Sequence, residues 1–94
     1  MPHFEVAHIQ ERGVDLIVIP LDNSFRLKSQ ADQDATIYEL RIRASSAGLA
    51  GTVVAVWDDG GGRMAFRAPR SFHPFLKSID LLYVAANINR KLYW

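Results

Sequence analysis

Two runs of β-branched and other apolar residues constrain the fold of this chain more than any other feature of its sequence. The run from Val14 to Leu21 is apolar on both faces in its middle, which is typical of a central strand covered on both sides. The run from Thr52 to Trp57 predicts a second strand. Because proline cannot donate a hydrogen bond to a neighbouring strand, we expect pairing to end at Pro20 and at Pro69.

Two further strands are expected next to these runs, each joined to its neighbour by a hairpin. The segment from His3 to Ile9 predicts a strand, and the polar residues Gln10–Gly13 separate it from the first run. The glycine-rich segment Asp58–Gly62 predicts a second hairpin, since glycine adopts positive φ angles freely. That hairpin would join the second run to a strand over Arg63–Ala68.

The most regular alternation of the chain lies between Thr36 and Ala44. In a helix the side chains of Glu39, Arg41 and Arg43 would be scattered around the axis, whereas in a strand they share one face. We therefore predict a strand over Thr36–Ala44. The segment Phe25–Lys28 alternates in the same way, and the polar segment Ser29–Ala35 predicts a loop.

In the last third of the chain, the spacing of the apolar residues changes from that of a strand to that of a helix. Pro74 suits the first position of a helical turn that ends at Ser78, and Asp80 can cap a longer helix after it. The apolar residues of this longer helix recur at helical spacing; they are Leu81, Val84, Ala85, Ile88 and Leu92. Arg90 and Lys91 would then lie in its last turn, where cations stabilise the helix dipole. A strand over Leu81–Val84 is the alternative that this stretch leaves open.

Together these patterns predict a single α+β domain over residues 1–94. We expect an antiparallel sheet of five or six strands, open or closed like a barrel, with a C-terminal helix packed on it. The longest uncharged stretch, which contains Ser45–Trp57, is shorter than the roughly 20 apolar residues of a membrane-spanning helix. No secretory signal is apparent at the N-terminus. We therefore expect a soluble, cytoplasmic protein that makes no contact with a membrane.

Several chemistries find no support in the sequence. The chain has no cysteine, which excludes disulfides, cysteine zinc sites and thiol nucleophiles. His3 and His8 are five positions apart, so on one strand they point to opposite faces and cannot share a metal ion. Ser71 and His73 lie close together, but nothing marks the third member of a catalytic triad. We therefore expect no metal and no cofactor.

The first four residues, Met1-Pro2-His3-Phe4, carry a resemblance to a known family. They resemble the start of tautomerase-superfamily subunits, in which removal of the methionine exposes an N-terminal proline whose amine acts as a base. The resemblance implies that Pro2 is the catalytic residue of a tautomerase-like enzyme, which is one of three functional hypotheses.

The charges of the chain are unevenly distributed although its formal net charge is only +1. Residues 1–24 have a net charge of −3 and residues 36–94 a net charge of +4. Three basic pairs are at even spacing, so on strands each pair would share one face; they are Arg26 with Lys28, Arg41 with Arg43, and Arg63 with Arg67. If these strands are neighbours, the six cations form a patch for a polyanion or for nucleic-acid phosphates. A polyanion-binding module is the second hypothesis.

Aromatic residues gather near the C-terminal end. A terminal tryptophan exposed to water is unusual, so we expect Trp94 to pack against the domain or against a partner. Because no convergent set of catalytic residues is apparent, our first hypothesis is a small non-catalytic binding or assembly domain that forms a homo-oligomer, most simply a dimer. The expected interface residues are Leu82, Tyr83, Tyr93 and Trp94. The sequence does not specify the ligand, which is a small molecule or a protein.

Overall fold

The computed structural model describes residues 3–11 and 13–93 of the chain. Its strands are β1 (His3–Glu11), β2 (Val14–Pro20), β3 (Thr52–Asp58), β4 (Met64–Arg67) and β5 (Arg90–Tyr93). Its α-helices are α1 (Gln30–Ser46), α2 (His73–Lys77) and α3 (Leu81–Ala86), and its 3₁₀ helices are η1 (Asn23–Leu27) and η2 (Arg70–Phe72). Among these elements no helix is long and apolar enough to cross a membrane.

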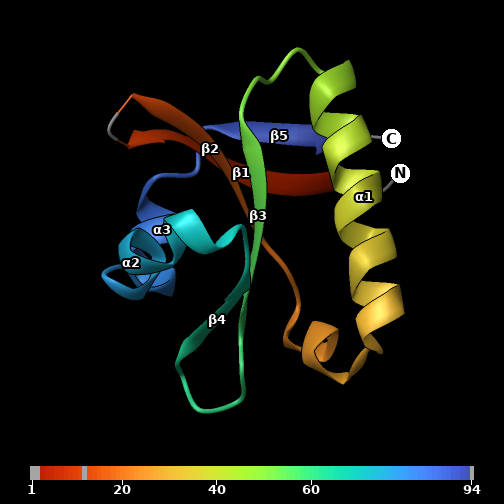
Figure 1. Ribbon diagram of the computed structural model, residues 1–94, viewed down its shortest axis with the longest axis vertical. Coiled ribbons are helices and arrows are strands. Elements are labelled where there is room, and N and C mark those ends of the chain that lie inside the picture. Colours follow the sequence, from red (N-terminus) through yellow and green to blue (C-terminus); the bar gives the residue numbers. More distant parts are fainter. Residues whose placement is uncertain (1–2, 12, 94) are drawn as a thin grey trace.

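The five strands form one sheet in the order β4-β3-β2-β1-β5 (Figure 1). The neighbours β2 and β3 are parallel, and the other three neighbouring pairs are antiparallel. A parallel pair needs a connection that crosses over the sheet, and α1 provides it between β2 and β3. The strands β4 and β5 lie at the two ends of the sheet.

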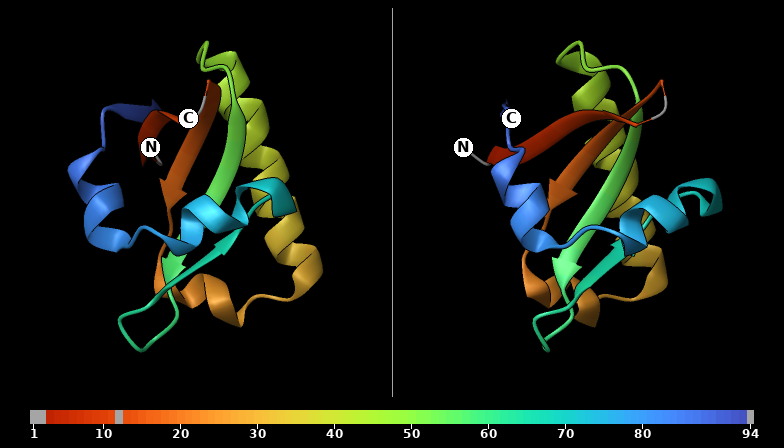
Figure 2. Two further views of the ribbon diagram at one scale, coloured as in Figure 1. Left: turned by 60° about the vertical axis from the view of Figure 1, so that its left-hand side comes forward. Right: turned by 90° about the vertical axis from the view of Figure 1, so that its left-hand side faces the viewer.

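Helices cover both faces of the sheet (Figures 1 and 2). The core under α1 contains Val6, Ile17, Ile19, Leu40, Ala44, Val53 and Leu92. The core under α2 and α3 contains Ala7, Leu16, Val18, Val54, Val56, Leu76 and Val84. Because side chains alternate along a strand, β2 contributes to both cores, and its apolar run is buried on both sides as predicted.

The predicted α+β class is confirmed, and the sheet has five strands. The strands expected over His3–Ile9, Val14–Leu21, Thr52–Trp57 and Arg63–Ala68 are confirmed, with bounds that differ by one or two residues. Two details of the predicted architecture are wrong, because the sheet is not wholly antiparallel and its helices are not confined to the C-terminal part. Of the open and barrel-like forms that the sequence allowed, the sheet has the open one.

The strand predicted over Thr36–Ala44 and the loop predicted over Ser29–Ala35 are also wrong, because both segments belong to α1. The hydroxyl of Ser29 caps this helix by accepting a hydrogen bond from the backbone N–H of Asp32 (3.1 Å). The apolar side chains that α1 buries recur at helical spacing; they are Ile37, Leu40 and Ala44. The alternating segment Phe25–Lys28 likewise contains the end of η1 instead of a strand.

The end of the chain differs from the predicted long helix. Asp80 does cap α3, since its carboxylate accepts from the N–H of Tyr83 (2.9 Å), but the helix ends at Ala86. Arg90 and Lys91 lie in β5 and not in a helix, and β5 pairs with β1. The strand pairing also places Leu92 in the core under α1, on the opposite side of the sheet from Val84.

The side chain of Asn89 extends the pairing of β5 with β1 by one position. Its Oδ1 accepts from the His8 N–H (2.9 Å) and its Nδ2 donates to the His8 C=O (3.0 Å), as a backbone group would. We expect Asn89→Ala to lower the free energy of unfolding by about 1–3 kcal/mol, because two hydrogen bonds are lost. Asn89→Asp keeps the acceptor for the His8 N–H but turns a carboxylate oxygen toward the His8 C=O, which also only accepts, so it should not recover the lost stability. Urea denaturation of the three proteins measures this, and equal stability of Asn89→Ala and the parent would contradict it.

Candidate functional site

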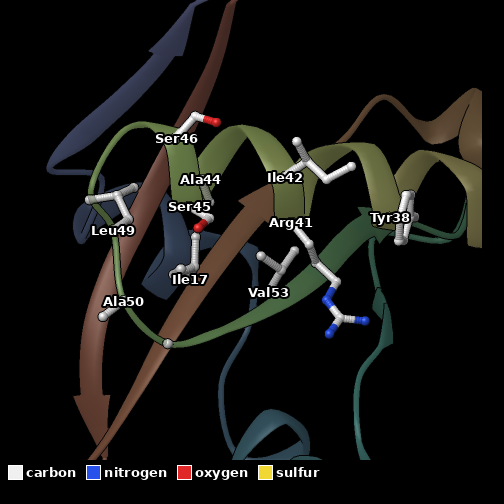
Figure 3. Close-up of a pocket in the computed structure, with 11 residues that line it drawn as sticks. Ile17, Tyr38, Arg41, Ile42, Ala44, Ser45, Ser46, Leu49, Ala50 and Val53 are labelled. Carbon is white, nitrogen blue, oxygen red and sulfur yellow. The ribbon is translucent and has the colours of Figure 1, made fainter.

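An open groove of about 530 Å³ lies between the C-terminal half of α1 and the start of β3 (Figure 3). One wall consists of α1 side chains, which are Tyr38, Arg41, Ile42 and Ser45. The other wall consists of Val53 and the residues before it, Leu49, Ala50 and Gly51. We call this feature the β3 groove. Figure 3 shows Arg41 extending from α1 toward β3.

Helix α1 forms its wall of the β3 groove with a second stripe of side chains. Tyr38, Ile42 and Ser45 follow each other at spacings of four and three residues, so they lie on one side of the helix. Leu40 and Ala44 lie on the adjacent side and are buried against the sheet. Tyr38 is 64% exposed and Ile42 is 43% exposed. The apolar surface of α1 therefore extends beyond the part that packs against the sheet.

The sheet is narrow here because β4 is shorter than β3. The pairing of β4 with β3 begins at Asp58 opposite Met64 and ends at Ala55 opposite Arg67. Two residues further in the same register, Val53 comes opposite Pro69, which has no N–H to donate. No backbone hydrogen bond joins Val53 and Pro69, and the Pro69 C=O accepts from Phe72 instead (3.0 Å). The first residues of β3 therefore have no strand neighbour on this side.

The backbone groups of Val53 point toward this open side. The C=O of Val56 accepts from the N–H of Leu21 (2.7 Å), so even-numbered residues of β3 direct their backbone groups toward β2. The N–H of Asp59 donates to the C=O of Arg63 (3.0 Å), so odd-numbered residues direct theirs toward β4. Val53 follows the second pattern, and there β4 has already ended.

A second hollow of about 420 Å³ continues the β3 groove toward β4, and Arg41 and Val53 line both hollows. Arg67 lines only the second hollow, where it forms an ion pair with Asp34 (2.8 Å) and donates to Gln33 Oε1 (3.2 Å). Within the described part of the chain the side chain of Arg41 has no ion pair or hydrogen bond. Arg41 is therefore the uncompensated positive charge of the groove.

The loop that carries Ala50 and Gly51 is fixed to the rest of the sheet. The ring of His8 on β1 donates from Nε2 to the C=O of Ala50 (3.0 Å), since a carbonyl oxygen can only accept. The N–H of Leu49 donates to the C=O of Ala44 at the end of α1 (3.0 Å). These bonds hold the loop wall of the β3 groove in place before any ligand arrives.

The six cations expected to share strand faces do not lie on three strands. Arg41 and Arg43 are on α1, where two positions correspond to about 200° around the axis, so they point in different directions. Arg43 pairs with Glu39 (3.0 Å), and Arg26 lies in η1 near Gly60. The remaining members are Lys28 after η1, Arg63 before β4 and Arg67 in β4. Only Arg41 and Arg67 come together, in the second hollow.

The residues expected at an oligomer interface are only partly described. Leu82 is 80% exposed on α3, and Tyr83 is 40% exposed with its ring edge-on to Phe75 (6.3 Å between centroids). Trp94, the side chain of Tyr93 and the N-terminal residue Pro2 lie outside the part of the chain that the structure describes. Their predicted roles at an interface and in catalysis stay predictions.

In the loop Asp58–Gly62, backbone N–H groups donate hydrogen bonds to aspartate carboxylates of the same loop. Asp58 Oδ1 accepts from the N–H groups of Gly60 (2.8 Å) and Gly62 (3.1 Å), and Asp59 Oδ1 accepts from that of Gly61 (3.1 Å). The described residues also contain no cluster of three or more potential metal ligands. The ring of His73 contacts the C=O of Ala68 (3.0 Å).

The sequence predicts Arg41 as one of six candidate contact residues, but it gives no indication of the β3 groove around it. The groove requires that Tyr38 and Ile42 lie on a helix, whereas the alternation of their segment predicts a strand. A usable signal was the polar Ser29 followed by Asp32, which is typical of the start of a helix. Comparison of the chain with family models, with curated proteins and with solved structures finds no match.

Proposed function

We propose that this protein is a binding domain whose ligand occupies the β3 groove. The observation that carries the proposal is the meeting of three unsatisfied surfaces in one place. They are the exposed apolar side chains of Tyr38 and Ile42, the outward-facing backbone of Val53 and the uncompensated guanidinium of Arg41.

Each of these surfaces alone would be ordinary. Single exposed apolar residues are common on soluble proteins, and so are arginines without an ion pair. Their combination in one concave place is characteristic of ligand sites, which join apolar walls to a few convergent polar groups. The loop wall held by His8 adds to this, because a pre-formed site loses less conformational entropy on binding.

A fragment library screened by two-dimensional amide NMR tests the proposal. We expect the fragments that bind to shift the amide signals of Ser45, Gly51 and Val53 more than those of α2 and α3. The variant Ser45→Trp places a large ring in the groove and should abolish these shifts.

The matched control is Ala86→Trp, which introduces the same ring at an exposed position of α3 on the other side of the sheet. This variant should bind the same fragments as the parent protein. Fragments that shift only signals outside the groove, or that bind Ser45→Trp unchanged, would contradict the proposed function.

A further inference from the structure

We infer that the natural occupant of the β3 groove is an extended peptide segment of a partner protein, with an acidic side chain that pairs with Arg41. The segment would add to the open edge of β3 as a short additional strand. This inference rests on the proposed function and specifies its partner. It follows from the backbone of Val53, the shape of the groove and its charge.

The backbone of Val53 determines the conformation of the occupant. An N–H and a C=O that point outward from the same strand residue are best satisfied by another extended chain, which offers a donor and an acceptor at the matching spacing. The available edge runs from Gly51 to Val54, and at about 3.3 Å per residue it accommodates three to four residues. Beyond Val54 the position beside β3 is already taken by β4.

The walls of the groove determine the side chains of the occupant. Every second side chain of an added strand would face α1, because side chains alternate along a strand. One such position lies beside the rim residues Tyr38 and Ile42, which favour an apolar side chain. The next lies beside Arg41, whose guanidinium fits a carboxylate through two parallel hydrogen bonds.

The charges of the two hollows favour an acidic segment over a basic one. Arg67 is already neutralised by Asp34, so it adds no demand for a counter-ion. Arg41 lines both hollows without an ion pair among the described residues, and Asp34, which lines the second hollow with it, is paired with Arg67. A carboxylate from the occupant would supply the missing charge.

A second copy of this chain fits the same edge less well. Suppose that two β3 edges met in antiparallel orientation around Val53. The β4 strand of each copy would then occupy the space beside the residues that precede Val53 in the other copy. The contact would then be limited to about one residue pair. Two such edges would also bring two Arg41 side chains together, and like charges repel.

Selection from a random seven-residue peptide library displayed on phage tests this inference on the full chain. We expect the enriched peptides to contain Asp or Glu two positions from an aliphatic residue. Arg41→Glu should weaken their binding by about tenfold to a hundredfold, as expected for the loss of a hydrogen bond between charged groups. Arg63→Glu makes the same charge change outside the groove and should alter binding less than twofold.

Hydrogen exchange of the peptide complex tests the added strand itself. We expect the exchange of the Val53 amide to slow on binding, whereas the amide of Val54, which faces β2, should be unaffected. Methylation of the peptide nitrogen that donates to the Val53 C=O should abolish binding.

Failure of this inference can be separated from failure of the proposed function. If no peptide is enriched over the unselected library, or if binding does not depend on Arg41 and leaves Val53 unprotected, the peptide inference is wrong. If fragments nevertheless map to the β3 groove, the proposed function stands with a different class of ligand. If neither fragments nor peptides bind there, both are wrong.

Discussion

Leu40→Ala should lower the free energy of unfolding by about 2–5 kcal/mol, the range observed when a buried leucine is truncated. Leu40 is 1% exposed and packs in the core under α1 with Ile17, Ile19 and Val53. The truncation leaves a cavity between the helix and the centre of the sheet, and the neighbouring strands can close it only in part. Urea denaturation followed by circular dichroism measures the change.

Tyr38→Ala is the matched control for this experiment. Tyr38 is 64% exposed at the rim of the β3 groove, so its truncation should cost less than about 1 kcal/mol. In a strand over Thr36–Ala44 the side chains of Tyr38 and Leu40 would share one face, and their truncations would have similar costs. Similar losses of stability for both variants would therefore contradict the helical assignment of this segment.

The sheet was largely predictable because its strongest signals are local. The β-branched runs in β2 and β3 cannot be placed on a one-sided amphipathic helix, and the glycines after Asp58 indicate the hairpin to β4. Pro69 also ended its strand as expected. These signals depend on neighbouring residues only, so they need no knowledge of the tertiary structure.

Helix α1 was missed because it has two adjacent apolar stripes instead of one. Ile37, Leu40 and Ala44 face the sheet, while Tyr38 and Ile42 lie beside them on the groove side. Together the two stripes produce an apparent alternation over nine residues, which imitates the period of a strand. The exposed stripe that misled the prediction is therefore the same one that forms the β3 groove.

The last residues form a strand because they pair with β1, which lies far away in the sequence. Helical spacing extends from Leu81 to Leu92, but the first part of β1 up to the buried Val6 has no partner on β2, and β5 pairs with it instead. Such tertiary pairing overrides a local period and cannot be recognised from the segment alone. The open edge of β3 could not be predicted for the same reason, because it depends on the strand register that places Val53 opposite Pro69.

Gly51→Ala should destabilise the protein by about 2–5 kcal/mol, since it combines a strained backbone with a steric clash. Gly51 has a φ of 137°, and a Cβ added there would lie 2.6 Å from the carbonyl oxygen of Asp15 at the start of β2. Gly48→Ala is the control: its φ of 81° is also positive, but an added Cβ would meet nothing within 4 Å. We expect it to cost only about 1–2 kcal/mol.

The two glycine variants should also differ in how they affect the β3 groove. Thr52 pairs with Leu16 immediately after Gly51, so relief of the clash with Asp15 must shift the beginning of β3 and the backbone of Val53 with it. Gly51→Ala is therefore expected to weaken both stability and the binding of library-selected peptides, whereas Gly48→Ala should weaken stability alone. Urea denaturation and peptide titration below the unfolding range measure the two effects separately. Unchanged affinity in a folded Gly51→Ala protein would show that the occupant does not bind along the edge of β3, because a strand added there depends on the position of Val53.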